Sequence, residues 1–352
     1  MELVSDLPDD VIRDFLSRVP YDDLPSIASV CKGWMAEVQL PEFHRLRKET
    51  GHAQKLIVMA QVRVQPNRSG LENFSELQLT IFEPDSGVLR ELPLAPGIFS
   101  KLTMFCLLAG VGSDLVAMGG IDPVTGKVSN SVFVYDFVSA TWRRGVDMPG
   151  GPRSFFGCAS EPDRRMVYVA GGHDGDKMAL KSAMAYDLAK DEWVMLPDMA
   201  RERDECKAIF HAGKFHVIGG YCTEMQGRFE RSAEAFDVAA RQWGQVEEDF
   251  LYAGVCPRTC VGADDGAVYM CKRGNVVALT GAKGQVVAKL PDELCNIAHT
   301  ATWRDKLLVI GAAGFGRPHV GYMLDLRGYS WTKLETPKKY SGHVQAGGYL
   351  EI

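Results

Sequence analysis

Apolar residues in the first 50 positions recur with the spacing of short amphipathic helices. In the first segment they fall one, three and four positions apart, at Val11, Ile12, Phe15, Leu16 and Val19. This spacing gathers them on one face of a helix and leaves the charged residues between them on the other. Pro20 ends this helix, and Pro41 opens the last of the helical segments that follow. We therefore predict a small all-α domain over residues 1–50.

From residue 55 the pattern changes to short apolar runs separated by glycine-rich turns, which is typical of strands. Apolar residues followed by a glycine pair occur three times, ending at Gly120, Gly172 and Gly220. The tryptophans that follow these pairs, 51 and then 50 residues apart, are Trp142, Trp193 and Trp243. This period matches the four-stranded blade of a kelch-type β-propeller. Because one blade cannot bury both of its faces, we predict that blades stack into a ring with the tryptophans between neighbours.

Three further copies of the repeat are degraded. They cover residues 55–93, 256–291 and 299–334, and the first two contain no tryptophan. The first copy has no strand ahead of Lys55, and the strand-like segment 343–352 has no other partner. We predict that this C-terminal segment supplies the innermost strand of the first blade and closes the ring. The predicted fold is an all-β kelch propeller of six blades over residues 51–352, preceded by the helical domain.

Composition narrows the class of protein. The 352-residue chain has a net charge of −6, with acidic and basic residues mixed along its length and no basic stripe for nucleic acid. Its nine cysteines are an odd number without a CxxC pair, which is typical of reduced thiols. No apolar run approaches the roughly 18 residues of a membrane helix, and the acidic start lacks the features of a secretory signal. We expect no membrane association and a cytoplasmic and nuclear location.

The helical domain contains short motifs in a fixed order: L-P-x-D-x-I, L-S-R-V-P, D-L-P-S-I-A-S-V-C-K-x-W and L-P-E-F-H-R-L-R. These resemble the F-box motif at nearly every anchor position. The resemblance implies that the domain binds Skp1 and, through it, the Cul1 scaffold of a ubiquitin ligase. It implies that eight residues bury against Skp1 or hold the surface that does: Leu7, Pro8, Ile12, Leu16, Leu24, Val30, Cys31 and Trp34. On pattern alone, the alternative is a helical cap packed on the propeller.

In kelch propellers the loops that enter the innermost strands and the loops after the glycine pairs project on one face. Here these loops carry arginines, acids and aromatic residues, which suit a protein-recognition surface. The residues that we assign to target binding are Arg153, Ser154, His173, Asp174, Arg203, Asp204, Tyr221 and Arg258. The alternative is that the three arginines, at equivalent repeat positions, stabilise the blades by pairing with neighbouring acids.

Motifs that suggest catalysis have simpler explanations. The segment from Gly311 to Gly316 resembles a dinucleotide fingerprint but does not open a helix inside a strand–helix–strand unit. Cys256 and Cys260 have no second pair of ligands nearby, so a zinc site is not expected. We predict no catalytic residue, no metal and no cofactor. The alternative is a metal-dependent enzyme on the kelch fold, as in galactose oxidase, which is similar in architecture.

The whole chain resembles plant F-box/kelch-repeat proteins, and the segments 150–160, 201–221 and 342–352 closely resemble the group called KISS ME DEADLY. The resemblance implies a non-catalytic substrate-recognition adaptor of an SCF (Skp1–Cul1–F-box) E3 ubiquitin ligase, which directs targets to proteasomal degradation. The group is linked to turnover of phenylalanine ammonia-lyase and of type-B response regulators. This implies phenylpropanoid metabolism or negative regulation of cytokinin signalling. The alternative is a non-degradative scaffold that binds Skp1.

Overall fold

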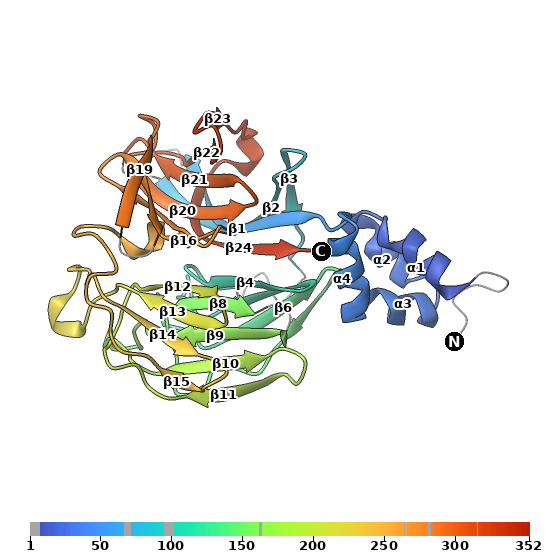
Figure 1. Ribbon diagram of the computed structural model, residues 1–352, viewed down its shortest axis with the longest axis horizontal. Helices are drawn as coiled ribbons and strands as arrows, with labels where there is room; N and C mark the ends of the chain where they lie inside the picture. Colours follow the sequence, from blue (N-terminus) through green and yellow to red (C-terminus); the bar gives the residue numbers. More distant parts are fainter. Residues whose placement is uncertain are drawn as a thin grey trace.

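The computed structural model describes residues 8–66, 72–94, 102–161, 164–263, 265–280, 283–314 and 316–352. Within them a small helical domain precedes a ring of β-sheets (Figure 1). The helices are α1 (Asp9–Ser17), α2 (Leu24–Ala28), α3 (Lys32–Val38) and α4 (Pro41–Glu49), with a 3-10 turn, η1 (Tyr21–Asp23), before α2. The predicted helical region is confirmed.

Six four-stranded antiparallel sheets follow in the described part of the chain, each forming one blade. The strands are β24 (His343–Glu351), β1 (Lys55–Pro66), β2 (Glu72–Glu83) and β3 (Val88–Leu92) in blade 1; β4 (Leu107–Val111), β5 (Asp114–Met118), β6 (Val132–Asp136) and β7 (Thr141–Arg144) in blade 2; β8 (Gly157–Glu161), β9 (Met166–Ala170), β10 (Ala183–Asp187) and β11 (Glu192–Leu196) in blade 3; β12 (Lys207–His211), β13 (Lys214–Ile218), β14 (Ala233–Asp237) and β15 (Gln242–Trp243) in blade 4; β16 (Val261–Gly262), β17 (Val268–Lys272), β18 (Asn275–Thr280) and β19 (Lys283–Lys289) in blade 5; β20 (Asn296–Trp303), β21 (Lys306–Ala312), β22 (Val320–Asp325) and β23 (Trp331–Lys333) in blade 6. The six-bladed propeller is therefore confirmed, including the blade without a glycine pair or tryptophan at 256–291.

The C-terminal strand closes the ring, as predicted. β24 pairs antiparallel with β1, with Leu350 opposite Leu56, and it becomes the innermost strand of blade 1. The beginning and the end of the propeller sequence therefore share one sheet, which joins the last blade to the first.

Tryptophans of the fourth strands connect neighbouring blades. Each indole ring packs among apolar side chains, and its Nε1–H donates to a main-chain oxygen of the preceding blade. The four pairs, with distances of 2.7 to 2.8 Å, are Trp142 to Pro93, Trp193 to Val146, Trp243 to Pro197 and Trp331 to Lys289. An indole ring that fills the inter-blade space also has its N–H group satisfied there, which explains why tryptophan recurs at this position in four of the six blades.

One hydrophobic cluster spans the helical domain and the first two blades. Leu16, Leu24 and Phe43 of the helices lie in the same buried cluster as Leu56 of β1 and Phe137 after β6. Within its described residues, the helical domain therefore has no core separate from that of the propeller. It packs on the propeller at the side where the innermost strands end (Figure 1).

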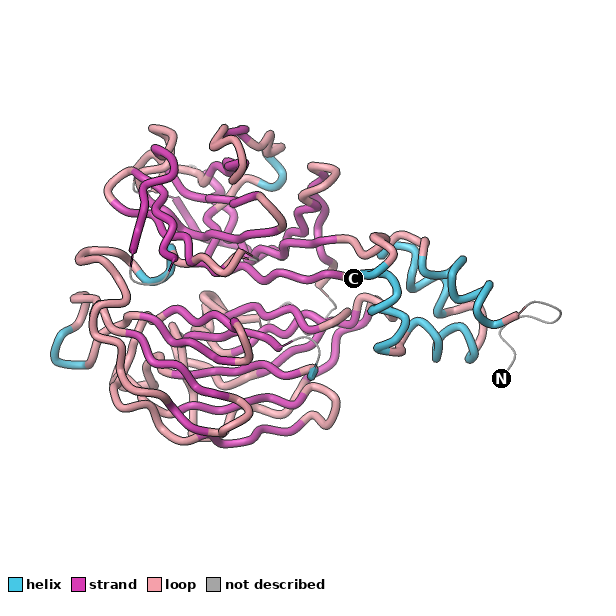
Figure 2. The backbone as a smooth tube through the Cα atoms, viewed as in Figure 1, coloured by secondary structure: helices cyan, strands magenta, loops and turns pink. Residues whose placement is uncertain are grey.

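The innermost strands surround a central channel. A cavity of about 510 Å³ is lined by residues of β24, β4, β8, β12, β16 and β20. These strands begin at a side rich in loops and end toward the helical domain (Figure 1). The tube view shows loops gathered at the end of the propeller that lies away from the helices (Figure 2). We call the side where they begin the loop face.

Candidate docking surfaces

The helical domain exposes several large apolar side chains. Val11 and Phe15 on α1 are 51% and 66% exposed, and Val30, just before α3, is 61% exposed. Met35 on α3 is also exposed. Leu40 is 40% exposed as well. A single exposed apolar residue is ordinary, but five on so small a domain indicate a surface that another protein covers. We call Val11, Phe15, Val30 and Met35 the outer apolar face.

Helix α1 carries two adjacent apolar stripes, and the propeller covers one of them. Ile12 and Leu16, four positions apart, are buried in the cluster shared with the propeller, together with Leu24 of α2. Val11 and Phe15, also four apart, are exposed. The three buried residues belong to the predicted Skp1-binding set, and within this chain they pack beneath the outer apolar face. Val11 and Phe15 were not in that set, although the width of the apolar pattern in α1 was a signal for them.

The other residues of the predicted Skp1-binding set lie near the domain surface. Pro8, Val30 and Cys31 are exposed, and Trp34 is half-buried against the shared cluster. The Sγ atom of Cys31 caps α3, because it accepts a hydrogen bond from the main-chain N–H of Trp34 at 3.4 Å. Leu7 lies outside the described residues.

A buried arginine ties the helical domain to the last strand of the propeller. The guanidinium group of Arg47 on α4 donates to main-chain oxygens of Ser17, Val19 and Ile352 at 2.8, 2.6 and 3.2 Å. Burial lowers the pKa of Arg47 to about 10. One side chain thus links α4, the end of α1 and the end of β24.

Polar contacts around η1 make a second link between the domains. The hydroxyl of Tyr21 donates to Glu83 of β2 at 3.0 Å, and the main-chain N–H of Tyr21 donates to the side chain of Gln54 at 2.7 Å. Arg90 of β3 lies 3.2 Å from Asp22 and 2.8 Å from Glu83. Together with Arg47 and the shared cluster, these contacts make the join between the domains stiff.

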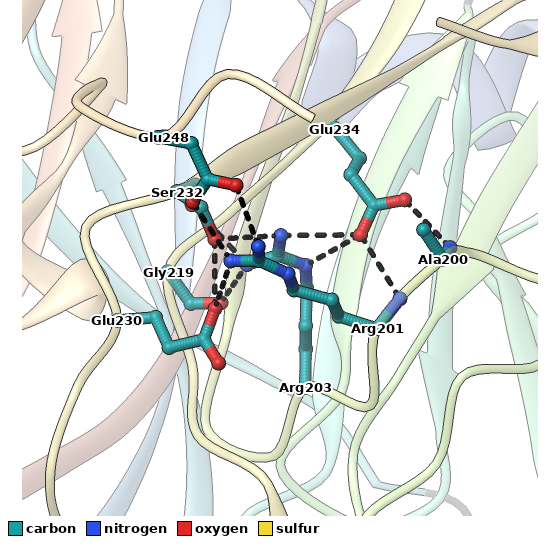
Figure 3. A network of polar contacts seen from close by, with 8 residues as sticks. All are labelled: Ala200, Arg201, Arg203, Gly219, Glu230, Ser232, Glu234 and Glu248. Atoms are coloured by element: carbon teal, nitrogen blue, oxygen red, sulfur yellow. Dashed lines mark hydrogen bonds and ion pairs between the residues drawn. The ribbon is translucent and has the colours of Figure 1, made fainter. Parts of the chain in front are cut away.

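On the loop face, Arg203 is a structural residue. It is fully buried with Glu234, and their charged groups lie 3.1 Å apart (Figure 3). The guanidinium group also donates to the main-chain oxygen of Gly219 at 2.7 Å and to the hydroxyl of Ser232 at 2.9 Å. Arg203 therefore connects the loop that enters β12 with the glycine pair after β13 and with the start of β14.

Arg153 plays the same role one blade earlier. It is buried and donates to the main-chain oxygen of Gly171 at 3.1 Å and to the hydroxyl of Ser182 at 2.7 Å. Burial lowers its pKa to about 10. The assignment of Arg153 and Arg203 to a target-binding surface is corrected accordingly: their guanidinium groups are enclosed, because each satisfies carbonyl groups of its own blade.

Most other residues assigned to target binding lie just beneath the loop face. Ser154 is fully buried, and the imidazole of His173 lies 3.0 Å from the carboxylate of Asp204, both of them buried. Tyr221 is also buried. Asp174 is half-buried and accepts hydrogen bonds from main-chain N–H groups of its own loop. These side chains hold the loops in place. Direct contact of any of them with a target stays a prediction.

Arg258 is the exposed member of the predicted set. Its guanidinium group lies 3.2 Å from the carboxylate of Glu205 and 5.7 Å from the ring centre of Phe155. Phe105 packs against Phe155 with ring centres 5.2 Å apart, and the main-chain N–H of Phe105 donates to the side chain of Gln345 at 2.9 Å. Phe105, Phe155, Arg258 and Gln345 line a small cavity of about 90 Å³ at the start of the innermost strands. We call these four residues the channel mouth.

The backbone at the channel mouth has an uncommon conformation. Phe105, Phe155 and Glu205 occupy equivalent positions before β4, β8 and β12, and their φ angles are 56°, 52° and 50°. Residues other than glycine rarely adopt this left-handed backbone conformation, and those that do often cluster at functional sites. The sequence prediction missed all three, and the signal for two of them was an aromatic residue at the same repeat position.

In the part of the chain that the structure describes, the histidine, cysteine and acidic side chains form no group of three arranged to hold a metal ion. Among the helices described, none has both the length and the apolar character needed to cross a membrane.

Comparisons with known proteins agree with this architecture. The family model of the F-box domain matches residues 4–46, and the model of the Kelch motif matches residues 104–149 and 154–200. Two proteins of Arabidopsis thaliana, F-box/kelch-repeat proteins At1g15670 and At1g80440, are 48% and 49% identical to this chain over 360 aligned residues, and each alignment covers both chains completely. A third, F-box/kelch-repeat protein SKIP20, is 32% identical over 73% of this chain and 69% of its own length.

Among solved structures, YjhT superimposes on 73% of this chain and 91% of its own with a TM-score of 0.59. The two sequences are 13% identical over this region, so the similarity concerns the fold.

Proposed function

The chain belongs to the family of F-box/kelch-repeat proteins, and from this premise we propose that it is the substrate-recognition adaptor of an SCF E3 ubiquitin ligase. Its helical domain binds a Skp1-like protein and, through it, Cul1. The loop face of the propeller binds the target protein. The chain itself is a non-catalytic subunit, and it accelerates ubiquitination by holding the target near the ubiquitin-loaded enzyme.

The observation that carries this proposal is the outer apolar face. Val11, Phe15, Val30 and Met35 are exposed on the F-box domain while the neighbouring stripe of α1 packs on the propeller. Covering these side chains removes apolar surface from water, which favours association. The loop face lies at the opposite end of the innermost strands, so a partner on the helical domain leaves the loops free for a target (Figure 1).

The test is co-purification of the full chain with a Skp1-like protein. A Phe15→Glu/Val30→Glu variant places two charges on the outer apolar face without touching the shared cluster, and we expect it to lose the complex. The matched control is Val124→Glu, because Val124 is 89% exposed on a propeller loop. If the double variant keeps its thermal unfolding midpoint and still co-purifies as the wild type does, the proposed docking surface is refuted.

We further propose phenylalanine ammonia-lyase and type-B response regulators as the targets, and a cytoplasmic and nuclear location in which both are reached. Support comes from the sequence resemblance of segments 150–160, 201–221 and 342–352. The test is the half-life of each candidate in plant cells with the wild type and with the Phe15→Glu/Val30→Glu variant. Faster decay with the wild type alone supports degradation. Binding without any change in half-life favours a non-degradative scaffold instead, and a fluorescent fusion reports the location.

A further inference from the structure

The central channel has an unusual charge pattern. The 510 Å³ cavity and the smaller cavity at the channel mouth share part of their wall, including Leu108, Cys158, Lys207 and His299. None of the described residues that line either cavity is an aspartate or a glutamate. The chain as a whole carries a net charge of −6, so its channel has the opposite character to its surface.

Lys207 is the cation inside this channel. It lies at the start of β12 and is half-buried, and among the described residues its ammonium group has no hydrogen bond or ion pair. The thiols of Cys158 and Cys260 lie nearby, but burial raises the pKa of each to about 12, so both are neutral. Burial in turn lowers the pKa of Lys207. An ammonium group that is half-buried in a channel and has no protein partner is a favourable contact for an anionic ligand.

His299 supplies a second polar group without a partner. It lies on β20, is 7% exposed, and its buried Nε2 atom makes no hydrogen bond to the described residues. The imidazole lies against Gly347 of β24, where an added Cβ would come within 2.4 Å of Nε2. Burial and the charge of Lys207 lower the pKa of His299 to about 3, so the ring is neutral and can donate through Nε2–H.

We propose that the channel binds an anionic group, a carboxylate or a phosphate, through the ammonium of Lys207 and the Nε2–H of His299. The group enters from the loop face through the channel mouth, where Phe105 and Phe155 offer apolar contact beside it. Its source is either an acidic side chain of the target protein or a free small anion. If the anion is a side chain of the target protein, the inference rests on the proposed function. If it is a free small anion, the inference is independent of that function.

The test uses the full chain and two kinds of probe at constant ionic strength. Inorganic phosphate and glutarate represent free anions, and the capped peptide Ac-Gly-Leu-Glu-Leu-Gly-amide, with its glutamine counterpart, represents a target side chain. Binding is measured by isothermal titration calorimetry on the wild type, on Lys207→Met and on His299→Gln. The control is Lys214→Met, because Lys214 lies on the neighbouring strand, is exposed, and lies near Asp237.

We expect Lys207→Met to weaken binding about tenfold or more, because it removes a charge-assisted contact, while Lys214→Met changes nothing. We expect Lys207→Met to be at least as resistant to denaturant as the wild type, because it removes an unpaired charge; this separates lost binding from lost folding. Preference for the glutamate peptide over its glutamine counterpart and over free anions assigns the site to a target side chain. Preference for phosphate or glutarate assigns it to a small ligand.

The inference is overturned if none of these anions binds the wild type, or if Lys207→Met and His299→Gln bind them as the wild type does. Co-purification with the Skp1-like protein is measured on the same variants. If that complex forms and the anions do not bind, only the channel site is refuted and the adaptor function stands.

Discussion

The buried pair of Arg203 and Glu234 gives the sharpest test of how the loop face is held together. Both side chains are fully buried, and Glu234 otherwise accepts hydrogen bonds only from main-chain N–H groups, those of Ala200 and Arg201 at 2.7 and 3.3 Å, among the residues described (Figure 3). In Arg203→Met the carboxylate of Glu234 stays buried without a cation. Removing one partner of a buried ion pair costs about 3 to 5 kcal/mol of unfolding free energy.

Arg153→Met is the matched control, because it deletes the same atoms at the equivalent position of the preceding blade. Arg153 donates to the main-chain oxygens of Gly171 and Ser182 and to the Ser182 hydroxyl, with no carboxylate among its described partners. Its loss therefore leaves neutral acceptors unsatisfied, which costs about 1 to 3 kcal/mol. The difference between the two variants isolates the charge of Glu234.

Equilibrium denaturation in urea measures both variants, and a double-mutant cycle with Glu234→Gln completes the design. We expect Arg203→Met to be the more destabilised of the two and Glu234→Gln to restore part of the loss when combined with it. If Arg203→Met costs no more than Arg153→Met, or if Glu234→Gln makes the double variant worse by its full single-variant cost, the buried charge does not carry the effect.

Three further predictions follow from the way the chain is closed and buried. Deletion of residues 343–352 removes the innermost strand of blade 1, so we expect loss of cooperative unfolding by circular dichroism; a soluble truncation with a sharp melting transition would contradict this. Arg47→Met cuts the contact between α4 and Ile352, and we expect faster proteolysis at the junction near residue 50 while the propeller stays folded. Burial lowers the pKa of His44 and of His319 to about 4, so the folded state binds fewer protons than the unfolded state between pH 6.5 and 4. The free energy of unfolding therefore has its full value above pH 6.5 and falls as the pH drops toward 4, by about 2 kcal/mol per histidine at pH 5. A His319→Gln variant should show a shallower decline with pH in urea titrations.

The sequence predicted the fold well because most blades repeat the same local pattern of short apolar strands and glycine-rich turns. Trp142, Trp193 and Trp243 are evenly spaced because each occupies the same place in its blade and donates a hydrogen bond from Nε1–H to the preceding blade. The strand at 343–352 was predicted by elimination, because only one blade lacked an innermost strand. Both inferences need only the order of elements along the chain.

The residues of the surfaces were harder to predict, because exposure depends on partners far away in the sequence. Ile12 and Phe15 are both apolar positions of α1, and only the docking of the helix on blades 1 and 2 makes one buried and the other exposed. Arg153 lies four residues before β8 and Arg258 three residues before β16, in corresponding loops of the repeat, yet the guanidinium group of Arg153 is buried against Gly171 and that of Arg258 lies at the channel mouth. The sequence shows that the two loops correspond, whereas the partners of the two side chains are seen only in the structure.

The last strand connects the two proposed docking surfaces within one rigid element. Gln345 lies at a β-bulge of β24, between the pairs Ala60–Ala346 and Gln61–Val344, and its side chain reaches Phe105 at the channel mouth. Ile352, at the other end, is held by Arg47 of the helical domain. Seven residue steps at about 3.3 Å each place the two contacts about 23 Å apart. Because β24 is hydrogen-bonded along its length to β1, this distance cannot stretch as a flexible linker does. A target bound at the channel mouth, as proposed, would thus be held at a fixed position relative to the F-box, which is the geometry that catalysis by proximity requires.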